Sequence, residues 1–161
     1  MENKNVIKKQ MMLYFTFAAL MILLNYFIQK SNQLVFAPYI CSNLEENNFF
    51  RNLYCSTSVF NMPELVGSVV AVGITYITKF FLDKFIVFKS SESSVKDTSK
   101  EFVKYFGFAV LTTIENIGIQ FIMTNFFKTP LEVSFVFALS VGYLTKFFLD
   151  KRYVFILNKK I

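Results

Sequence analysis

Four long apolar segments set the strongest limit on how this chain can fold. They cover residues 11–28, 65–82, 105–127 and 131–149, and none alternates apolar and polar residues as a half-buried strand would. A helix that crosses the hydrocarbon core of a bilayer needs about 20 mostly apolar residues, so each segment has the length of one span. The sequence therefore predicts an all-α membrane protein with four transmembrane helices.

The composition excludes most soluble classes of protein. The chain has 161 residues, of which 54% are hydrophobic, 17% are charged and 22 are Phe, and a soluble domain of this size cannot bury so much apolar surface. It contains no His, the commonest catalytic base and metal ligand. It also has no glycine-rich phosphate loop and no Ser–His or Cys–His pair. We therefore expect no enzyme activity, no catalytic residue, no metal site and no cofactor.

The first apolar segment has two interpretations, because it follows the basic residues Lys4, Lys8 and Lys9. It is either a signal peptide or a transmembrane helix that stays in the protein. Its apolar run is longer than the core of a typical signal peptide, and no small-x-small cleavage site follows it. The uncleaved helix is the better interpretation.

The positive charges are distributed unevenly around the four spans. The net charge of +6 suits either nucleic acid or a membrane surface as partner, and the positions of the charges decide between them. All basic residues except Lys30, Arg51 and Lys128 lie in the N-terminal tail, between spans two and three, or at the C-terminal end. Because cytoplasmic segments are enriched in Lys and Arg, both termini are predicted to be cytoplasmic. Nucleic acid is not expected as a partner.

Two cysteines, Cys41 and Cys55, fall in the predicted outer loop 29–62. In an oxidising compartment they would form a disulfide, and closing a loop of about 15 residues would stabilise the fold by roughly 3 kcal/mol. The alternative is a pair of free thiols.

The chain contains the same helical hairpin twice. The segments YITKFFLDKFIVF (76–88) and YLTKFFLDKRYVF (143–155) are identical at ten of 13 positions, with an offset of 67 residues. Spans one and three match at an offset of 91, which relates Asn25 to Asn116 and Gln29 to Gln120. We expect repeat 1 over about 10–88, a cytoplasmic linker over 89–100 and repeat 2 over about 101–155. Two spans in each repeat predict parallel repeats around a pseudo-two-fold axis along the membrane normal.

Several polar residues lie inside the apolar spans, where an unpaired polar group is costly. Asn25 and Gln29 are four residues apart and share one helix face, and Asn116 and Gln120 repeat this arrangement. They either line a polar route for a headgroup or form interhelical hydrogen bonds. Glu115 has no acidic counterpart in the first repeat, and it would carry protons, bind a cation, meet a Lys or remain a structural carboxyl.

Basic residues form a cluster at the end of each repeated hairpin. A cation held at the depth of the lipid headgroups can bind a phosphate as a point charge. The alternative is that these side chains only reach the interface and set the topology. The candidates for binding a lipid phosphate are Lys79, Lys84, Lys146, Lys151 and Arg152.

The repeated blocks KFFLDKFIVF (79–88) and KFFLDKRYVF (146–155) resemble the segment NFLLNRYWVF that ends the second and fourth helices of GtrA-like proteins. The resemblance extends loosely into the first helix, and Lys replaces the Asn and Arg of the family segment. It implies a single GtrA-like domain over 1–161 in the cytoplasmic membrane. Such proteins resemble flippases for polyprenyl-phosphate-linked sugars in cell-surface polysaccharide or teichoic-acid glycosylation.

Three functions follow as hypotheses. The first is translocation of a polyprenyl-phosphate-linked sugar, with the basic clusters holding the phosphate and the polar residues lining the route. The second is a membrane scaffold for a separate glycosyltransferase, because a similar four-helix unit anchors some dolichol-phosphate mannose synthases. The third is a small proton-coupled exporter that uses Glu115 as its proton site. Four helices make a narrow unit among the membrane lipids, which leaves room for a homodimer.

Overall fold

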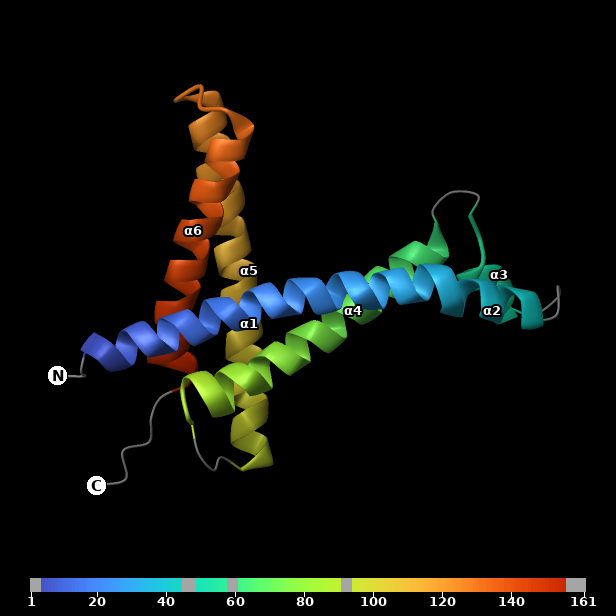
Figure 1. The fold of residues 1–161 in the computed structure, drawn as a ribbon, viewed down its shortest axis with the longest axis horizontal. Helices are drawn as coiled ribbons and strands as arrows, with labels where there is room; N and C mark the ends of the chain where they lie inside the picture. The colour runs from blue at the N-terminus through green and yellow to red at the C-terminus, as the bar shows by residue number, and fades with distance from the viewer. Residues whose placement is uncertain (1–3, 45–48, 58–60, 91–93, 156–161) are drawn as a thin grey trace. The chain divides into compact units, whose positions relative to one another are not determined.

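The computed structural model describes residues 4–44, 49–57, 61–90 and 94–155, which form helices and short connections without a strand (Figure 1). Within these described residues, six α-helices and three short π-helical turns follow one another. In order they are α1 (Lys4–Ser31), η1 (Asn32–Phe36), α2 (Ala37–Asn43), α3 (Phe49–Tyr54), α4 (Met62–Leu82), η2 (Asp83–Val87), α5 (Val95–Asn125), α6 (Leu131–Leu149) and η3 (Asp150–Val154).

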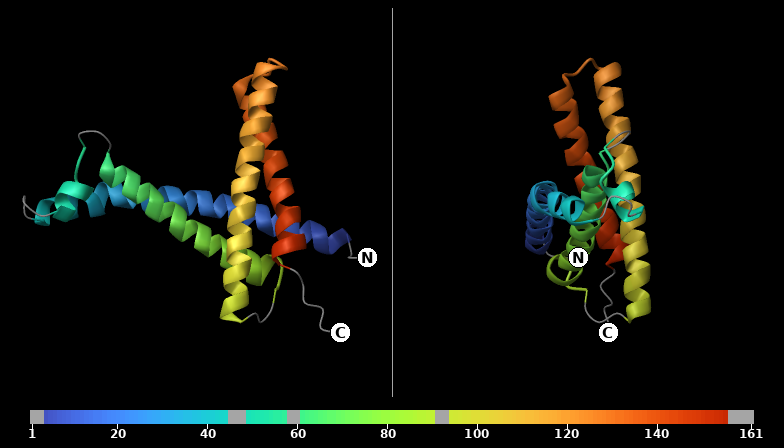
Figure 2. Two further views of the ribbon diagram at one scale, coloured as in Figure 1. Left: turned by 180° about the vertical axis from the view of Figure 1, so that it is seen from behind. Right: turned by 90° about the vertical axis from the view of Figure 1, so that its right-hand side faces the viewer.

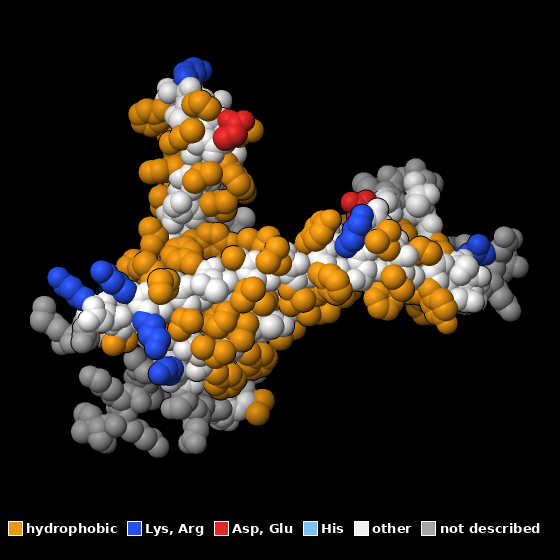
Figure 3. Space-filling view, viewed as in Figure 1, with side chains coloured by type: hydrophobic (Ala, Val, Ile, Leu, Met, Phe, Trp, Pro, Cys, Tyr) orange, Lys and Arg blue, Asp and Glu red, His pale blue; other side chains and the backbone are white. Residues whose placement is uncertain are grey.

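Four stretches are long and apolar enough to cross a membrane. They are Lys4–Asn43, Met62–Val87, Val95–Asn125 and Leu131–Val154. Between 6% and 28% of each apolar window is buried within the structure, so most of its surface is left for lipid. Hydrophobic side chains accordingly spread along the outside of the helices (Figure 3). The prediction of an all-α membrane protein with four spans is confirmed.

The helices extend beyond the predicted spans at two places. Helical structure continues from α1 through η1 and α2 to Asn43, and α3 follows, so much of the predicted outer loop 29–62 is helical. The residues of η1 include the apolar run Leu34–Phe36, and Pro38 lies in the first turn of α2, where its missing N–H is tolerated. Helix α5 begins at Val95, so the predicted linker 89–100 is also helical in its second half.

The chain divides into two compact units. The N-terminal unit is Thr16–Phe81, and the C-terminal unit is Leu82–Ile161 together with Met1–Phe15. In the N-terminal unit the later part of α1 lies beside α4, and in the C-terminal unit α5 lies beside α6 (Figure 2). Each unit is described by itself below.

Small residues on α4 and α6 allow the close helix packing in both units. Every fourth residue on one face is small and buried, and these positions are related by the offset of 67 residues. They are Gly67, Ala71 and Thr75 on α4, and Ser134, Ala138 and Gly142 on α6. Small residues at this spacing let two helices approach closely in a membrane, where lipid removes the hydrophobic drive for association.

Candidate functional site

A buried ionic cluster lies at the end of α6 in the C-terminal unit. The carboxylate of Asp150 accepts a hydrogen bond from the Tyr14 hydroxyl at 2.8 Å and forms an ion pair with Lys146, whose Nζ lies 2.8 Å from Oδ2. Tyr14 and Asp150 are both fully buried. A buried charge needs a partner and further hydrogen bonds, and this carboxylate has both.

The same contact occurs a second time with the two sequence repeats exchanged. The Tyr105 hydroxyl donates to the buried carboxylate of Asp83 at 2.8 Å, and Tyr105 and Asp83 are the repeat equivalents of Tyr14 and Asp150. Each tyrosine therefore donates to the aspartate of the other repeat. Lys146 joins the two contacts, because its Nζ lies 3.6 Å from the centre of the Tyr105 ring.

A second exchanged pair involves the lysines that follow the two aspartates. Lys84 Nζ lies 2.7 Å from the Glu101 carboxylate and also donates to Thr98 at 2.7 Å. Lys151 donates to the side-chain oxygen of Gln10 at 2.8 Å, and Gln10 is the repeat equivalent of Glu101. The end of each hairpin is thus held by the first turns of a helix from the other repeat.

Asp83 and Asp150 are the first residues of the π-helical turns η2 and η3, and Lys84 and Lys151 are the second. The two turns occupy equivalent positions and each is followed by a buried Phe, Phe88 or Phe155, whose rings stack with centroids 4.9 Å apart. A π-helical turn widens the helix locally and shifts the side chains that follow it. This shift accompanies the burial of Asp83, Lys84 and Asp150 inside the unit.

A column of polar side chains runs between α1 and α4 in the N-terminal unit. The Asn25 amide donates to Thr75 Oγ1 at 3.4 Å, and Gln29 donates to the Asn25 side-chain oxygen. Gln29 in turn accepts a hydrogen bond from the Ser68 hydroxyl at 3.2 Å. Asn32 continues the same face of the chain and donates to the Pro63 carbonyl at 2.7 Å.

The column leads to a cavity of about 860 Å³ at the end of α1 and the start of α4. Gln29 belongs to both the column and the cavity wall. The polar and charged side chains around the cavity include Gln29, Lys30, Asn32, Gln33, Arg51 and Glu64. Sites of roughly 300–1,000 Å³ that combine apolar walls with a few polar groups are typical of small-molecule binding.

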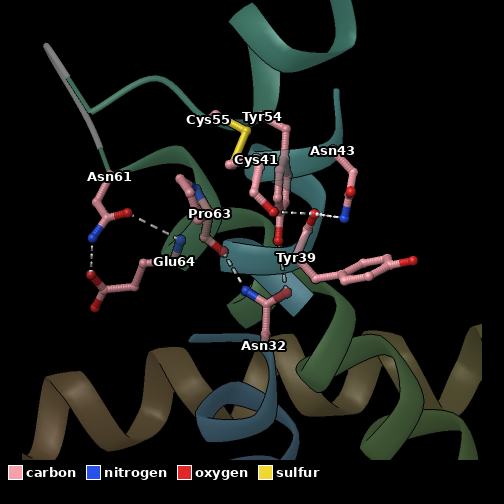
Figure 4. Close-up of a disulfide and its surroundings, with 10 residues drawn as sticks. Asn32, Tyr39, Cys41, Asn43, Tyr54, Cys55, Asn61, Pro63 and Glu64 are labelled. Carbon is pink, nitrogen blue, oxygen red and sulfur yellow. Dashed lines mark hydrogen bonds between the residues drawn. A yellow bond between two sulfur atoms is a disulfide. The ribbon is translucent and has the colours of Figure 1, made fainter. Parts of the chain in front are cut away.

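The walls of the cavity are cross-linked. Cys41 and Cys55 form a disulfide that ties α2 to the residue after α3, and both cysteines line the cavity (Figure 4). The Tyr54 hydroxyl donates to the Asn32 side-chain oxygen at 2.8 Å. A Cβ atom at Gly67 would collide with the Asn32 amide, so the close approach of α4 to η1 requires a glycine there.

A family model described as the GtrA/DPMS transmembrane domain matches residues 48–155. The chain belongs to this family. The resemblance predicted from the repeated segments is confirmed, and family membership indicates a membrane protein that handles sugars attached to lipid carriers. No curated protein and no solved structure matches the chain.

For this GtrA/DPMS member, the predicted phosphate-binding residues have different environments. Lys84 and Lys146 are buried, and their charges are met by Glu101 and Asp150. Lys151 is half-buried against Gln10, and Arg152 is exposed. Lys79 is half-buried and belongs to the N-terminal unit. The five cations thus differ in exposure, and Arg152 alone among them is exposed.

The residues of the predicted headgroup route fall into separate units. Asn25 and Gln29 form the polar column of the N-terminal unit, whereas the other three lie in the C-terminal unit. There, the Thr145 hydroxyl donates to Glu115 at 3.0 Å. Asn116 packs against Gly142, and its buried Oδ1 accepts no hydrogen bond from any residue in the described ranges. Gln120 is half-buried one turn further along α5.

Sequence reasoning missed the tyrosines of the buried cluster and the polar wall of the cavity. Tyr14 and Tyr105 are equivalent in the repeat, and that equivalence was the available signal. Asn32 follows Asn25 and Gln29 at the next position of the same helix face, so helical spacing also pointed to it. Among the residues that the structure describes, no group of His, Cys, Asp and Glu is placed to hold a metal ion.

Proposed function

We propose that this protein translocates a polyprenyl-phosphate-linked sugar across the cytoplasmic membrane for glycosylation of a cell-surface polymer, with both termini in the cytoplasm. Family membership supports the class of substrate, and the four apolar spans support the location in a membrane. The prenyl chain stays in lipid during this step, so only the sugar and its phosphate need a polar path.

The observation that carries the proposal is the polar column in the N-terminal unit. Four hydrogen-bonding side chains from α1 and α4 follow one another inside a span, where an unmatched polar group is costly. Amides and hydroxyls both donate and accept hydrogen bonds. Sugar hydroxyls therefore exchange partners with them one at a time, and the column ends at the cavity.

The cations at the hairpin ends have two roles in this proposal. In the C-terminal unit, the exposed Arg152 and the half-buried Lys151 meet the lipid phosphate at the cytoplasmic face. In the N-terminal unit, the half-buried Lys79 has this role by itself. The buried Lys84 and Lys146 hold the helix ends through their carboxylate partners.

The test is reconstitution of the purified protein in liposomes with a fluorescent polyprenyl-phosphate sugar, followed by quenching of the outer leaflet. The double variant Asn25→Leu/Thr75→Val should slow translocation at least tenfold, because it removes the middle of the column. Thr113→Val is the matched control, because Thr113 is exposed on α5 and its hydroxyl donates to the Ala109 carbonyl of its own helix. Equal rates for the double variant and the wild type would refute a route through the column.

The second candidate function, a membrane scaffold for a glycosyltransferase, is favoured by the buried ionic cluster of the C-terminal unit. There, Lys146 pairs with Asp150 and Lys84 pairs with Glu101, and these contacts fix the helix ends. A scaffold predicts that the wild-type protein moves no lipid in the liposome assay and that a polyprenyl-phosphate glycosyltransferase co-purifies with it.

A further inference from the structure

The cavity of the N-terminal unit is lined by basic residues from outside the segments predicted to face the cytoplasm. Three basic residues lie outside the segments predicted to face the cytoplasm, namely Lys30, Arg51 and Lys128. Two of these three, Lys30 and Arg51, line the same cavity of about 860 Å³ although they are 21 positions apart in the sequence. The packing of α3 beside α2 therefore brings Arg51 to the same cavity as Lys30.

The charge of the cavity selects a class of ligand. Among the described residues that line the cavity, the formally charged side chains are Lys30, Arg51 and Glu64, and the Asn61 amide donates to the Glu64 carboxylate at 3.1 Å. The formal charges of these three side chains sum to +1. A phosphodiester carries one negative charge, so it matches this wall, and Arg and Lys are the side chains that bind phosphate oxygens.

The neutral polar groups of the wall suit a sugar. Gln29, Asn32 and Gln33 present amides, which both donate and accept hydrogen bonds, as each hydroxyl of a sugar does. Asn32 is already oriented by Tyr54 and by the Pro63 carbonyl (Figure 4). The volume of the cavity falls in the range of about 300–1,000 Å³ that holds organic ligands. It is several times larger than a lone phosphate needs.

The cavity is also built to keep its shape. The disulfide ties α2 to the chain beyond α3, and Gly67 lets α4 approach Asn32 closely. Next to it, Leu34, Val35 and Phe36 of η1 are each more than half exposed. These apolar side chains offer a surface for a lipid tail beside the polar cavity, as binding of a lipid-linked headgroup requires.

We infer that this cavity binds the phosphodiester-linked sugar headgroup of the lipid carrier, with the phosphate on Lys30 and Arg51 and the sugar on Gln29, Asn32 and Gln33. The inference rests on the proposed function for the nature of the lipid. It adds a binding site at the end of the N-terminal unit remote from the KFFLDK segment. The cavity then receives or releases the headgroup at one end of the polar column.

The test is equilibrium binding to the purified wild-type chain in lipid nanodiscs, without any translocation step. The probes are farnesyl-phosphoryl-glucose, soluble methyl-phosphoryl-glucose and inorganic phosphate, titrated by calorimetry. Both glucose phosphodiesters should bind, the lipid-linked one more tightly. Lys30→Gln and Arg51→Gln should each raise the dissociation constant about ten- to a hundredfold, because each removes a charge-assisted contact. Lys128→Gln, which removes an exposed cation outside the cavity, should leave it unchanged.

A second variant tests the amide wall of the cavity. Gln33 is exposed and accepts a hydrogen bond from Lys30 at 3.4 Å, so Gln33→Leu should fold normally and weaken binding of both glucose phosphodiesters. Inorganic phosphate that binds as tightly as methyl-phosphoryl-glucose would overturn the inference in favour of a simple anion site. Equal binding by wild type, Lys30→Gln and Arg51→Gln would overturn it as well.

The binding assay and the liposome assay can refute the cavity site and the proposed function separately. Translocation that persists in the liposome assay while the cavity variants bind normally would remove this site and leave the proposed function intact. Binding that depends on Lys30 and Arg51 in a protein that moves no lipid would keep the site and remove the flippase role.

Discussion

The ion pair between Lys84 and Glu101 offers the sharpest test of the buried cluster. The Lys84 side chain is 2% exposed, the Glu101 side chain is 17% exposed, and their charged atoms are 2.7 Å apart. Lys84→Met keeps the length of the side chain and leaves the glutamate without its partner. Removing one member of a buried pair costs about 3–5 kcal/mol, and the partial exposure of Glu101 favours the lower end, about 3 kcal/mol. For a chain of this size that corresponds to a fall in Tm of roughly 6–12 °C.

The assay is thermal unfolding of the purified protein in one detergent, with a double-mutant cycle. The double variant Lys84→Met/Glu101→Met should return to within about 1 kcal/mol of the wild type, because a buried pair replaced by apolar side chains is often neutral. Lys100→Met is the matched control, since Lys100 forms an exposed pair with Asp97 at 3.9 Å and should change stability by less than about 0.5 kcal/mol. Additive effects of the two single substitutions would refute the pairing.

Three further predictions use the same unfolding assay. Gly142→Ala should destabilise the protein by about 1–3 kcal/mol, because the new Cβ would lie 2.6 Å from Asn116 Oδ1; Gly118→Ala, with nothing within 4 Å, should be neutral or stabilising, and equal effects would count against the close approach. Tyr105→Phe should cost about 1–3 kcal/mol because Asp83 loses a 2.8 Å hydrogen bond, whereas Tyr39→Phe, at an exposed position, should change nothing. Cys41→Ser should lower the free energy of unfolding by about 3 kcal/mol, because it removes a cross-link across 14 residues. Reduction of the wild-type protein should lower its Tm as much as this substitution does. A wild-type protein that takes up a thiol label without reductant would contradict the disulfide.

The exchanged contacts connect the two repeated hairpins. Tyr14 donates to Asp150 and Tyr105 donates to Asp83, so neither repeat satisfies its own aspartate with its own tyrosine. A buried carboxylate without a donor is unfavourable. Each repeat therefore depends on the other for the polar groups at its end, which couples their folding.

The second repeat lacks part of the polar column found in the first. Asn25 meets Thr75, but its equivalent Asn116 meets Gly142, which has no side chain to offer. Ser68 has Phe135 as its equivalent. The two hairpins have equivalent end contacts and equivalent faces of small residues, whereas the complete polar column is found in the first hairpin.

The number and approximate positions of the membrane spans could be predicted from the sequence, because hydropathy over about 20 residues is a local property. The fourth span agrees with α6 (Leu131–Leu149) at both ends. The first span was predicted too short, since its helix continues through the π-helical turn η1, which allows Pro38 to follow within the same helical stretch. Family membership was also readable from the repeated segments, because they resemble the segment NFLLNRYWVF of GtrA-like proteins.

What only the tertiary structure decided is which charge meets which. The sequence places Lys84 and Lys146 at the ends of apolar helices, and that position suits a cation exposed to lipid phosphate as well as one buried against a carboxylate. Glu101 reaches Lys84 from α5, and Tyr14 reaches Asp150, the partner of Lys146, from α1. Arg51 lines the cavity because α3 packs beside α2. Contacts between residues far apart in the chain depend on helix packing and on the wider turns of η2 and η3. A pattern of residue types along one helix carries no information about either.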